Sequence, residues 1–263
     1  MGYSTLEVRR EEQVVWCALD RPEALNTFNV PLVEELHRFL DELAGDPSVR
    51  VLVLRGKGRA FCAGLDLKET GFGGDNVSAS LRGQQRIAQL VIKMRRLPQV
   101  IVACVHGPAC GGGFMLTLGS DIRLAADTAR MNGAAIKIGL SGCDVGLSYL
   151  LPRLVGASVA SELLLTGRFL HAERAHALGL IAAVVEEDEL QAEARRWVQD
   201  LLRATPLGLR LTKEALNASL EMTSLESVVA MEDRNQVLCT QSEDFREGIQ
   251  AFLEKREPVF QDR

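Results

Sequence analysis

The sequence predicts an α/β protein in which helices cover a largely parallel sheet and a helical region follows. Two observations lead to this fold class. In the first half of the chain, short apolar runs of strand length alternate with segments of helical periodicity. From Gly156 onward the pattern is mostly helical, and the composition changes near residues 190–205. We therefore expect an α/β core over residues 1–200 and a helical C-terminal subdomain over residues 201–263.

The elements of the first half follow in order along the chain. Residues 14–19 form an apolar run that predicts a strand, and apolar side chains at helical spacing from Pro31 predict a helix that stops at Gly45. A stretch rich in Gly and Ser over residues 70–80 predicts a mobile loop, and a helix is expected after it over about residues 81–96. Three further apolar runs predict strands at residues 51–54, 100–105 and 122–126.

In the C-terminal half, capping residues mark where helices begin. Ser, Thr and Asp side chains accept hydrogen bonds from the first free amides of a helix. Thr223 and Glu226 have the spacing of a capping box, and Pro206 suits the first position of a helix. One helix is expected to reach Ala204, and the last is expected to reach about Lys255. We expect these helices to begin at four caps, which are Asp188, Thr205, Thr223 and Ser242.

The composition is that of an ordinary globular protein, with 47% apolar and 25% charged residues. A net charge of −5 without a long basic run argues against nucleic acid as a partner. The apolar stretches are too short for a membrane span, and the first residues do not resemble a signal peptide. The six cysteines show no CxxC spacing and the four histidines no HxxxH pair. We therefore expect a cytoplasmic protein with free thiols and no metal site.

Two glycine turns are the most informative part of the chain. Each follows an apolar strand-like run, and they are Ala63-Gly64-Leu65 and Gly111-Gly112-Gly113. The second turn opens an apolar segment that predicts a buried helix, and the first N–H groups of a helix have no partner inside it. One backbone donor from each turn is the arrangement that stabilises a developing oxyanion, as enolate formation from a thioester requires.

Several further motifs are spread along nearly the whole chain. They are Leu19-Asp-Arg-Pro-Glu-Ala-Leu-Asn26, Gly58-Arg-Ala-Phe-Cys-Ala-Gly-Leu-Asp66, Val105-His-Gly-Pro-Ala-Cys-Gly-Gly-Gly113, Leu150-Leu-Pro-Arg-Leu-Val-Gly156, Leu165-Thr-Gly167 and Ala175-His-Ala-Leu-Gly-Leu180. On these motifs the chain resembles the enoyl-CoA hydratase/isomerase family, also called the crotonase family. The resemblance implies a spiral of ββα units with a helical trimerisation subdomain, assembly as a homotrimer or a dimer of trimers, and an acyl-CoA substrate. Coenzyme A would enter as part of that substrate, with no separate cofactor.

The resemblance also implies which residues form the binding site. It places the two oxyanion donors at the backbone N–H groups of Leu65 and Gly112. The residues that would hold coenzyme A or flank the donors are Glu23, Ala24, Ala63, Gly64, Asp66, Leu67, Lys68 and Gly111. Lys255 would reach the adenine end from a neighbouring subunit. The walls of the acyl pocket would be Phe72, Met115, Ala134, Ala135 and Leu140.

The chain departs from the hydratases of this family at the residues that would transfer protons. The two positions at which they carry catalytic glutamates are Met115 and Ala135 here, and neither side chain is an acid or a base. Asp144 remains, in a glycine-containing loop that the family directs into the acyl pocket. Apolar surroundings would raise the pKa of Asp144 and make it a candidate acid or base. An aspartate among glycines also stabilises turns, and the two roles are compatible.

Other polar residues have positions that suggest structural roles. We expect His106 to make a structural hydrogen bond, Asp66 to brace the first glycine turn and Glu162 to support the core or an interface. Tyr149 follows Asp144 closely, but an aromatic side chain in an apolar helix is usually there for packing. Arg55 and Lys57 beside Gly56 do not have the spacing of a phosphate-binding loop, and the absence of a GxSxG motif argues against a serine hydrolase.

Three functions remain open from the sequence. The first is an enzyme, an isomerase or an atypical hydratase, in which Asp144 moves a proton on an enolate that the amides of Leu65 and Gly112 stabilise. The second is a binding or carrier protein that holds acyl-CoA without turnover, since both glutamates are missing. The third is a hydrolase or dehalogenase in which Asp144 attacks the substrate and forms a covalent intermediate.

Overall fold

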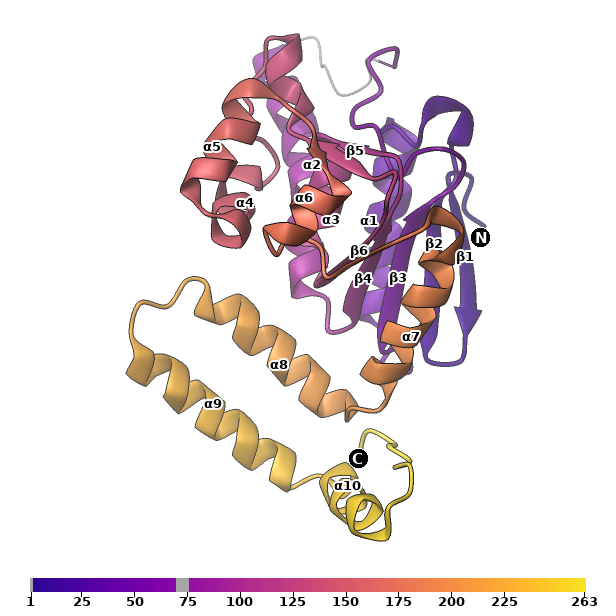
Figure 1. Cartoon of the computed structure of the whole chain (residues 1–263), viewed down its shortest axis with the longest axis vertical. Helices are drawn as coiled ribbons and strands as arrows, with labels where there is room; N and C mark the ends of the chain where they lie inside the picture. The colour runs from indigo at the N-terminus through magenta and orange to yellow at the C-terminus, as the bar shows by residue number, and fades with distance from the viewer. Residues whose placement is uncertain (1, 70–75) are drawn as a thin grey trace.

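The computed structural model describes residues 2–69 and 76–263, in which helices cover a mixed sheet (Figure 1). Within these residues the sheet has six strands in the order β1-β2-β3-β4-β6-β9. β1 pairs antiparallel with β2, and the other neighbouring strands pair in parallel. The strands are β1 (Leu6–Glu11), β2 (Val14–Leu19), β3 (Val51–Gly56), β4 (Val100–Val105), β6 (Ile122–Ala126) and β9 (Ala183–Val185).

Side chains alternate between the two faces of this sheet, and each face has its own helices. Val51 and Val53 are buried on one face in a cluster with residues of α7 (Leu190–Leu202). Leu52 and Leu54 belong to the larger core on the other face, together with residues of α1 (Val30–Ala44), α2 (Val77–Arg96) and α3 (Gly112–Gly119). Because both faces are covered, β2 and β4 are buried along their whole length, as is usual for parallel strands.

A second, smaller sheet precedes the elements of the candidate site. Its strands, in the order β5-β7-β8, are β5 (Pro108–Cys110), β7 (Arg130–Asn132) and β8 (Leu170–His171). β5 leads into α3, and β7 leads into the 3-10 helix η2 (Ala134–Ile138). α4 packs against α3 and α5. The helices that follow η2 are α4 (Leu147–Val155), α5 (Ala157–Thr166) and α6 (Ala172–Ala177).

The C-terminal part of the chain consists of α8 (Pro206–Ser219), α9 (Leu225–Thr240) and α10 (Glu243–Glu254). α8 and α9 pack together and extend away from the sheet (Figure 1). Lys213 anchors α8, because its Nζ lies 2.7 Å from a carboxylate oxygen of Asp121 beside β6. The predicted boundary at residues 200 and 201 falls within the last turn of α7 and stays a prediction. No helix in the described ranges is long and apolar enough to cross a bilayer.

Most of the predicted elements are confirmed. The strands predicted at residues 14–19, 100–105 and 122–126 have those bounds, and β3 continues past residue 54 to Gly56. Thr205 and Ser242 are caps as expected, since each hydroxyl accepts a hydrogen bond at 3.1 Å from an amide in the first turn of its helix. Local capping chemistry therefore predicts the starts of α8 and α10.

Three predicted helix starts are wrong. α2 begins at Val77 rather than near residue 81, because the Asn76 side chain accepts the amide of Ala79 at 2.9 Å and caps the helix inside the predicted loop. The rest of that loop, residues 70–75, lies outside the described residues. Ser224 caps α9 in place of Thr223. Asp188 lies in the 3-10 helix η3 (Glu187–Glu189), so α7 starts after it, and α7 ends before Ala204.

Candidate active site

The two glycine turns run side by side. Cys62 in the first segment forms a parallel bridge with Ala109 in the second, with hydrogen bonds from Cys62 N to Pro108 O at 3.1 Å and from Cys110 N to Cys62 O at 2.9 Å. Glycine makes this approach possible. A Cβ atom on Gly113 would lie only 2.0 Å from the Cys62 carbonyl oxygen. The structure therefore brings the two predicted turns into direct backbone contact.

The backbone N–H groups of Leu65 and Gly112 are free donors on these turns. In the part of the chain that the structure describes, neither amide has a hydrogen-bond acceptor. The neighbouring amides of Asp66 and Gly111 donate to backbone carbonyl oxygens at 2.9 and 3.0 Å. A Cβ atom on Gly111 would lie 3.9 Å from the Cα atom of Gly64, so the free donors belong to adjoining turns. Gly112 also begins α3, where the helix dipole favours negative charge.

Asp66 braces the first turn, which confirms that prediction. Its carboxylate accepts hydrogen bonds from the amide of Lys68 at 3.1 Å, from Arg21 Nη2 at 3.1 Å and from the Thr27 hydroxyl at 3.2 Å. Burial acts to raise the pKa of Asp66, but these donors together lower it below its usual range. Asp66 is therefore ionised at neutral pH, and its hydrogen bonds stabilise the turn.

The residues predicted to hold coenzyme A gather near the first turn. Glu23 and Ala24 lie in the 3-10 helix η1 (Pro22–Ala24). The next residue, Leu25, accepts the amide of Ala63 at its carbonyl oxygen at 3.0 Å. Lys68 is exposed three residues beyond Leu65, where its ammonium group is accessible to an anion. Two segments that are distant in sequence thus form one exposed edge beside the free amide of Leu65.

Leu67 and Lys255 are the two other residues predicted to contact coenzyme A. Leu67 is 61% exposed and lies on the same edge, between Asp66 and Lys68. Lys255 ends α10 in a left-handed conformation. In Figure 1, α10 lies at the opposite end of the molecule from β5. Within one chain, Lys255 is therefore far from the glycine turns, and its predicted contact requires a neighbouring subunit.

The predicted walls of the acyl pocket differ in exposure. Ala134 and Ala135 are partly buried in η2, and Leu140, just beyond it, is 55% exposed. Met115 is fully buried in the core beside the first turn of α3. Phe72 lies outside the described residues. The side chains at positions 115 and 135 are apolar where the family's hydratases have acids, so η2 and α3 offer no proton donor there.

Asp144 is half-buried in the loop between η2 and α4. This loop is adjacent to η2, since a Cβ atom on Gly133 would lie 3.5 Å from the Gly142 carbonyl oxygen. Gln84 Nε2 donates to Asp144 Oδ1 at 2.5 Å. Burial raises the pKa of Asp144 above its usual range, while the Val145 amide and Gln84 act in the opposite direction. A carboxyl group with a raised pKa is a stronger base when ionised, and a larger fraction of it carries a proton near neutral pH.

The remaining polar candidates have structural partners. His106 Nε2 lies 2.9 Å from the Gly58 carbonyl oxygen, which confirms its structural hydrogen bond. Glu162 forms an ion pair with Arg174 at 2.7 Å between α5 and α6. Tyr149 packs against the main core, as expected of an aromatic side chain in an apolar helix. None of these contacts involves the glycine turns.

Sequence reasoning missed Gln84. It lies in the first half of α2, within a polar and exposed stretch, and nothing in the local sequence distinguishes it from its neighbour Gln85. The contact with Asp144 joins residues that are 60 positions apart. Only the packing of α2 beside the Asp144 loop reveals it.

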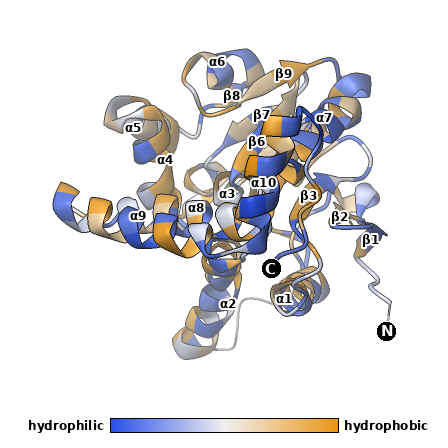
Figure 2. Ribbon diagram, turned by 90° about the horizontal axis from the view of Figure 1, so that it is seen from below, coloured by the Kyte–Doolittle hydropathy of each residue, from blue (hydrophilic) through white to orange (hydrophobic). Residues whose placement is uncertain are grey.

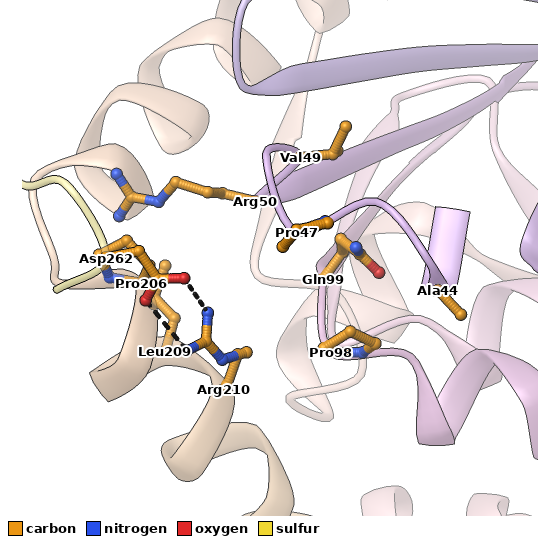
Figure 3. Close-up of a pocket in the computed structure, with 10 residues that line it drawn as sticks. All are labelled: Ala44, Pro47, Val49, Arg50, Pro98, Gln99, Pro206, Leu209, Arg210 and Asp262. Atoms are coloured by element: carbon orange, nitrogen blue, oxygen red, sulfur yellow. Dashed lines mark hydrogen bonds and ion pairs between the residues drawn. The ribbon is translucent and has the colours of Figure 1, made fainter. Parts of the chain in front are cut away.

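Two cavities lie beside α8 rather than at the glycine turns. The first, of about 200 Å³, opens where α7 runs into α8 and is drawn in Figure 3. Arg50 and Gln99 line it, and so does the ion pair of Arg210 with Asp262 at 2.8 Å. The second, of about 860 Å³, separates α8 from α2 and α4. Both cavities are bounded by the C-terminal helices, so they result from how α8 docks on the core.

Comparisons with known proteins show which family the chain resembles throughout its length. The family model described as "Enoyl-CoA hydratase/isomerase" matches residues 9–263. The chain is 36% identical over 256 residues to the probable enoyl-CoA hydratase EchA12 of Mycobacterium tuberculosis, covering 95% of this chain and 90% of the relative. It is 37% identical over 252 residues to the 1,2-epoxyphenylacetyl-CoA isomerase of Escherichia coli, covering 95% of each.

A solved structure matches the whole fold. The crystal structure of a putative enoyl-CoA hydratase from Streptomyces coelicolor superposes with a TM-score of 0.95 at 34% identity, covering 100% of this chain and 96% of the other. The predicted α/β class with C-terminal helices is therefore confirmed, and the fold is the crotonase fold.

Proposed function

Because the chain belongs to the enoyl-CoA hydratase/isomerase family, we propose that it is an enzyme that acts on an acyl-CoA thioester through an enolate. The observation that carries this proposal is the pair of free amides, Leu65 N and Gly112 N, on turns in contact. The thioester oxygen lies between them and gains negative charge as the enolate forms. Loss of one such donor typically costs about 2.7–4 kcal/mol of transition-state stabilisation, so the pair lowers the barrier substantially.

Asp144 is the residue that we assign to proton transfer. Its carboxylate removes a proton from a carbon of the acyl chain, and the electron pair of that C–H bond moves toward the thioester oxygen. The same carboxyl group returns the proton to another carbon, so the double bond moves and no atom is gained or lost. Burial raises the pKa of Asp144 toward neutral pH, which suits a group that both accepts and returns a proton.

Isomerisation suits this site better than hydration. Hydration of a double bond requires an activated water as well as a proton donor, and the family's hydratases use two glutamates for this. Met115 and Ala135 stand at those positions, and Asp144 is the acid that remains. The Escherichia coli relative is named as an isomerase of a coenzyme A ester, which supports the same conclusion.

Coenzyme A enters with the substrate, and we propose no separate cofactor. The edge formed by Glu23, Ala24, Leu67 and Lys68 is the part of the surface that we assign to its nucleotide. All six cysteines are free thiols, which agrees with a reducing compartment, and we propose a cytoplasmic location.

We also propose that the chain assembles as a homotrimer or a dimer of trimers through its C-terminal helices. Large hydrophobic side chains are exposed there, and Figure 2 shows hydrophobic residues along α8, α9 and α10. They include Leu216, Leu225, Val237, Phe252 and Leu253, each at least 60% exposed. Many large apolar side chains left exposed on neighbouring helices favour an interface there. Light scattering coupled to gel filtration would give the assembly mass, and a monomer would contradict this proposal.

Turnover of a panel of enoyl- and dienoyl-CoA esters tests the enzyme proposal. We expect isomerisation by the wild type and a loss of about 10²–10⁴-fold in kcat for Asp144→Asn, because general acid–base catalysis contributes that much. The matched control is Asp188→Asn. Asp188 is an exposed aspartate in η3, so this variant should leave kcat unchanged. Equal turnover by wild type and Asp144→Asn would remove Asp144 from the mechanism.

The same experiment separates the two alternatives. Binding of acyl-CoA esters with no turnover of any of them would identify a binding or carrier protein, for which the missing glutamates are the reason. A mass increase on acid-quenched protein that disappears in Asp144→Asn would identify Asp144 as a nucleophile in a hydrolase or dehalogenase. Either result would overturn the isomerase proposal.

A further inference from the structure

Gln84 joins α2 to the loop of the proposed acid and base. Its Nε2 lies 2.5 Å from Asp144 Oδ1, so its amide donates to the carboxylate. α2 is held in place one turn further on, where Ile87, Leu90 and Val91 are buried in the main core. The donor therefore comes from a rigid helix rather than from the loop that it contacts.

The loop itself supplies a second constraint on the carboxyl group. The Val145 amide acts on the Asp144 carboxyl group so as to lower its pKa, against the effect of burial. Val145 has a φ of 43°, a left-handed conformation that is rare for a β-branched residue. Such strain persists only where the surroundings hold the backbone firmly. The backbone of the loop is therefore restricted beside Asp144, and Gln84 holds the carboxylate itself.

We propose that Gln84 is a positioning residue for Asp144, which it holds by Oδ1 so that Oδ2 is the oxygen that exchanges the proton with substrate. Where it concerns substrate, this inference rests on the proposed function. A carboxyl group that takes a proton from one carbon and returns it to another must keep one oxygen directed at both. A single hydrogen bond from a rigid helix gives the carboxylate that fixed orientation.

A neutral donor suits this role better than a cation. A hydrogen bond to the ionised carboxylate favours the charged form, whereas burial favours the neutral form, and at Asp144 burial is the larger influence. An Arg or Lys at position 84 would add a full positive charge and make Asp144 a weak base. The neutral amide of Gln84 orients the Asp144 carboxylate and lowers its basicity less than a cation would.

No charged side chain in the described ranges adds an electrostatic influence to Asp144, so the effect of Gln84 is separable. Arg86 on α2 is paired with Glu34, and Arg153 on α4 lies over the ring of Tyr149. The titratable and charged groups on the surrounding elements are Arg82, Arg86, Lys93, Arg95, Arg96, Lys137, Cys143, Tyr149 and Arg153.

Titration of Asp144 in the protein without substrate is the first test. Carbon-13 NMR of protein labelled at aspartate carboxyl groups would follow Asp144, identified by the signal that Asp144→Asn removes. We expect Gln84→Met to raise the pKa of Asp144 by about one unit, because the ionised form loses a hydrogen bond. The matched control is Gln85→Met, an exposed glutamine on the same helix turn, which should leave the pKa unchanged. An unchanged pKa in Gln84→Met would overturn the inference.

The pH profile of turnover is the second test. Asp144 acts as a base in its ionised form, so kcat rises with pH through its pKa, and Gln84→Met should move this acid limb about one unit upward. On the plateau above it, kcat should fall about tenfold with little change in KM, since the carboxylate loses its orientation and coenzyme A keeps its contacts. A uniform fall at every pH, with the limb unmoved, would indicate a merely structural role and contradict the inference.

Two further variants sharpen the result. Gln84→Asn keeps the amide but is one methylene shorter, so it should behave like Gln84→Met. Gln84→Glu places a second carboxylate beside Asp144 and should raise its pKa more than Gln84→Met does. If the NMR shift appears but the wild type turns over no ester of the panel, the proposed function fails while the contact of Gln84 with Asp144 stands.

Discussion

Backbone hydrogen bonding differs between the glycine turns and the α8 junction, the place where Lys213 of α8 contacts the core. At the turns, the amides of Leu65 and Gly112 have no acceptor among the described residues. At the junction, Lys213 is only 6% exposed, and its Nζ lies 2.7 Å from the Gln99 carbonyl oxygen and 3.3 Å from that of Met94. One region leaves backbone donors free, and the other brings a buried cation to backbone acceptors.

The difference follows from exposure. A buried polar group without a partner is costly, so the donors of Lys213 are matched, with Asp121 as the third partner at 2.7 Å. Leu65 is exposed and Gly112 is partly exposed, so leaving their amides without an acceptor in the protein costs less than it would in the interior. The free amides of Leu65 and Gly112 are therefore available to a ligand, whereas the matched donors of Lys213 stabilise the docking of α8.

Arg50 also brings a buried cation to backbone carbonyl groups, at the end of α7, although its Nε has no partner among the described residues. Its guanidinium group donates to the carbonyl oxygen of Leu202 at 3.1 Å and to that of Ala204, where α7 ends. Arg50 also lines the cavity of Figure 3, between the sheet and α8. Buried cations thus complete the carbonyl ends of α2 and α7, at the place where the C-terminal helices leave the core.

The largest expected effect comes from forcing the two glycine turns apart. In Gly113→Ala the new Cβ atom would lie 2.0 Å from the Cys62 carbonyl oxygen, so the two backbones must move apart. We expect kcat/KM on an enoyl-CoA ester to fall at least about a hundredfold, as when an oxyanion donor is lost. Steady-state kinetics on folded protein, checked by circular dichroism, would measure it.

Gly45→Ala is the matched control for that variant. Its Cβ atom would meet the nearest atom at an ordinary 3.6 Å, and its φ of −85° suits any residue. Turnover by Gly113→Ala within twofold of the wild type would show that the amides of Leu65 and Gly112 do not act together.

The next largest effect is expected at the α8 junction, on stability rather than on catalysis. Lys213→Met removes a buried cation and leaves Asp121 with Arg95 at 3.6 Å as its remaining ion pair. Breaking a buried pair in this way typically costs about 3 kcal/mol of unfolding free energy. Denaturant unfolding would measure the loss. In the control Lys93→Met, an exposed pair with Asp41 is removed, which should cost less than about 1 kcal/mol.

The two regions also differ in how far the sequence predicts them. The glycine turns are predictable because their chemistry is local: three consecutive glycines after an apolar run indicate a close backbone approach and a helix start. Lys213 and Arg50 are not, because nothing beside them in sequence shows that they are buried. Their partners lie in other elements, and only the docking of α8 and α7 brings them together.

The same limit explains the rest of the site. Asp144 stands out in the sequence as an acid among glycines, but its partner Gln84 lies 60 positions away in a polar helix turn. The start of α2 was hidden because residues 77–80 are exposed or partly buried and show no apolar periodicity. Contacts within one turn of chain are therefore predictable from sequence, and contacts between elements depend on tertiary packing.

The smallest expected effect concerns the residue that caps α9, which the sequence predicts wrongly. Thr223 and Ser224 are adjacent hydroxyl residues, and the sequence alone favours Thr223 because of Glu226. In the structure the Ser224 hydroxyl accepts the amide of Ser227 at 3.3 Å and also donates to the Glu226 carboxylate at 2.8 Å. Ser224→Ala should therefore cost about 1 kcal/mol of unfolding free energy, as loss of a helix cap usually does.

Thr223→Ala is the matched control, and it should change the unfolding free energy by less than about 0.5 kcal/mol, as at an ordinary surface position. Denaturant unfolding of both variants measures the difference directly. If Thr223→Ala were the more damaging change, α9 would begin one residue earlier in solution. The capping box in the sequence would then describe this helix better than the cap geometry of Ser224 does.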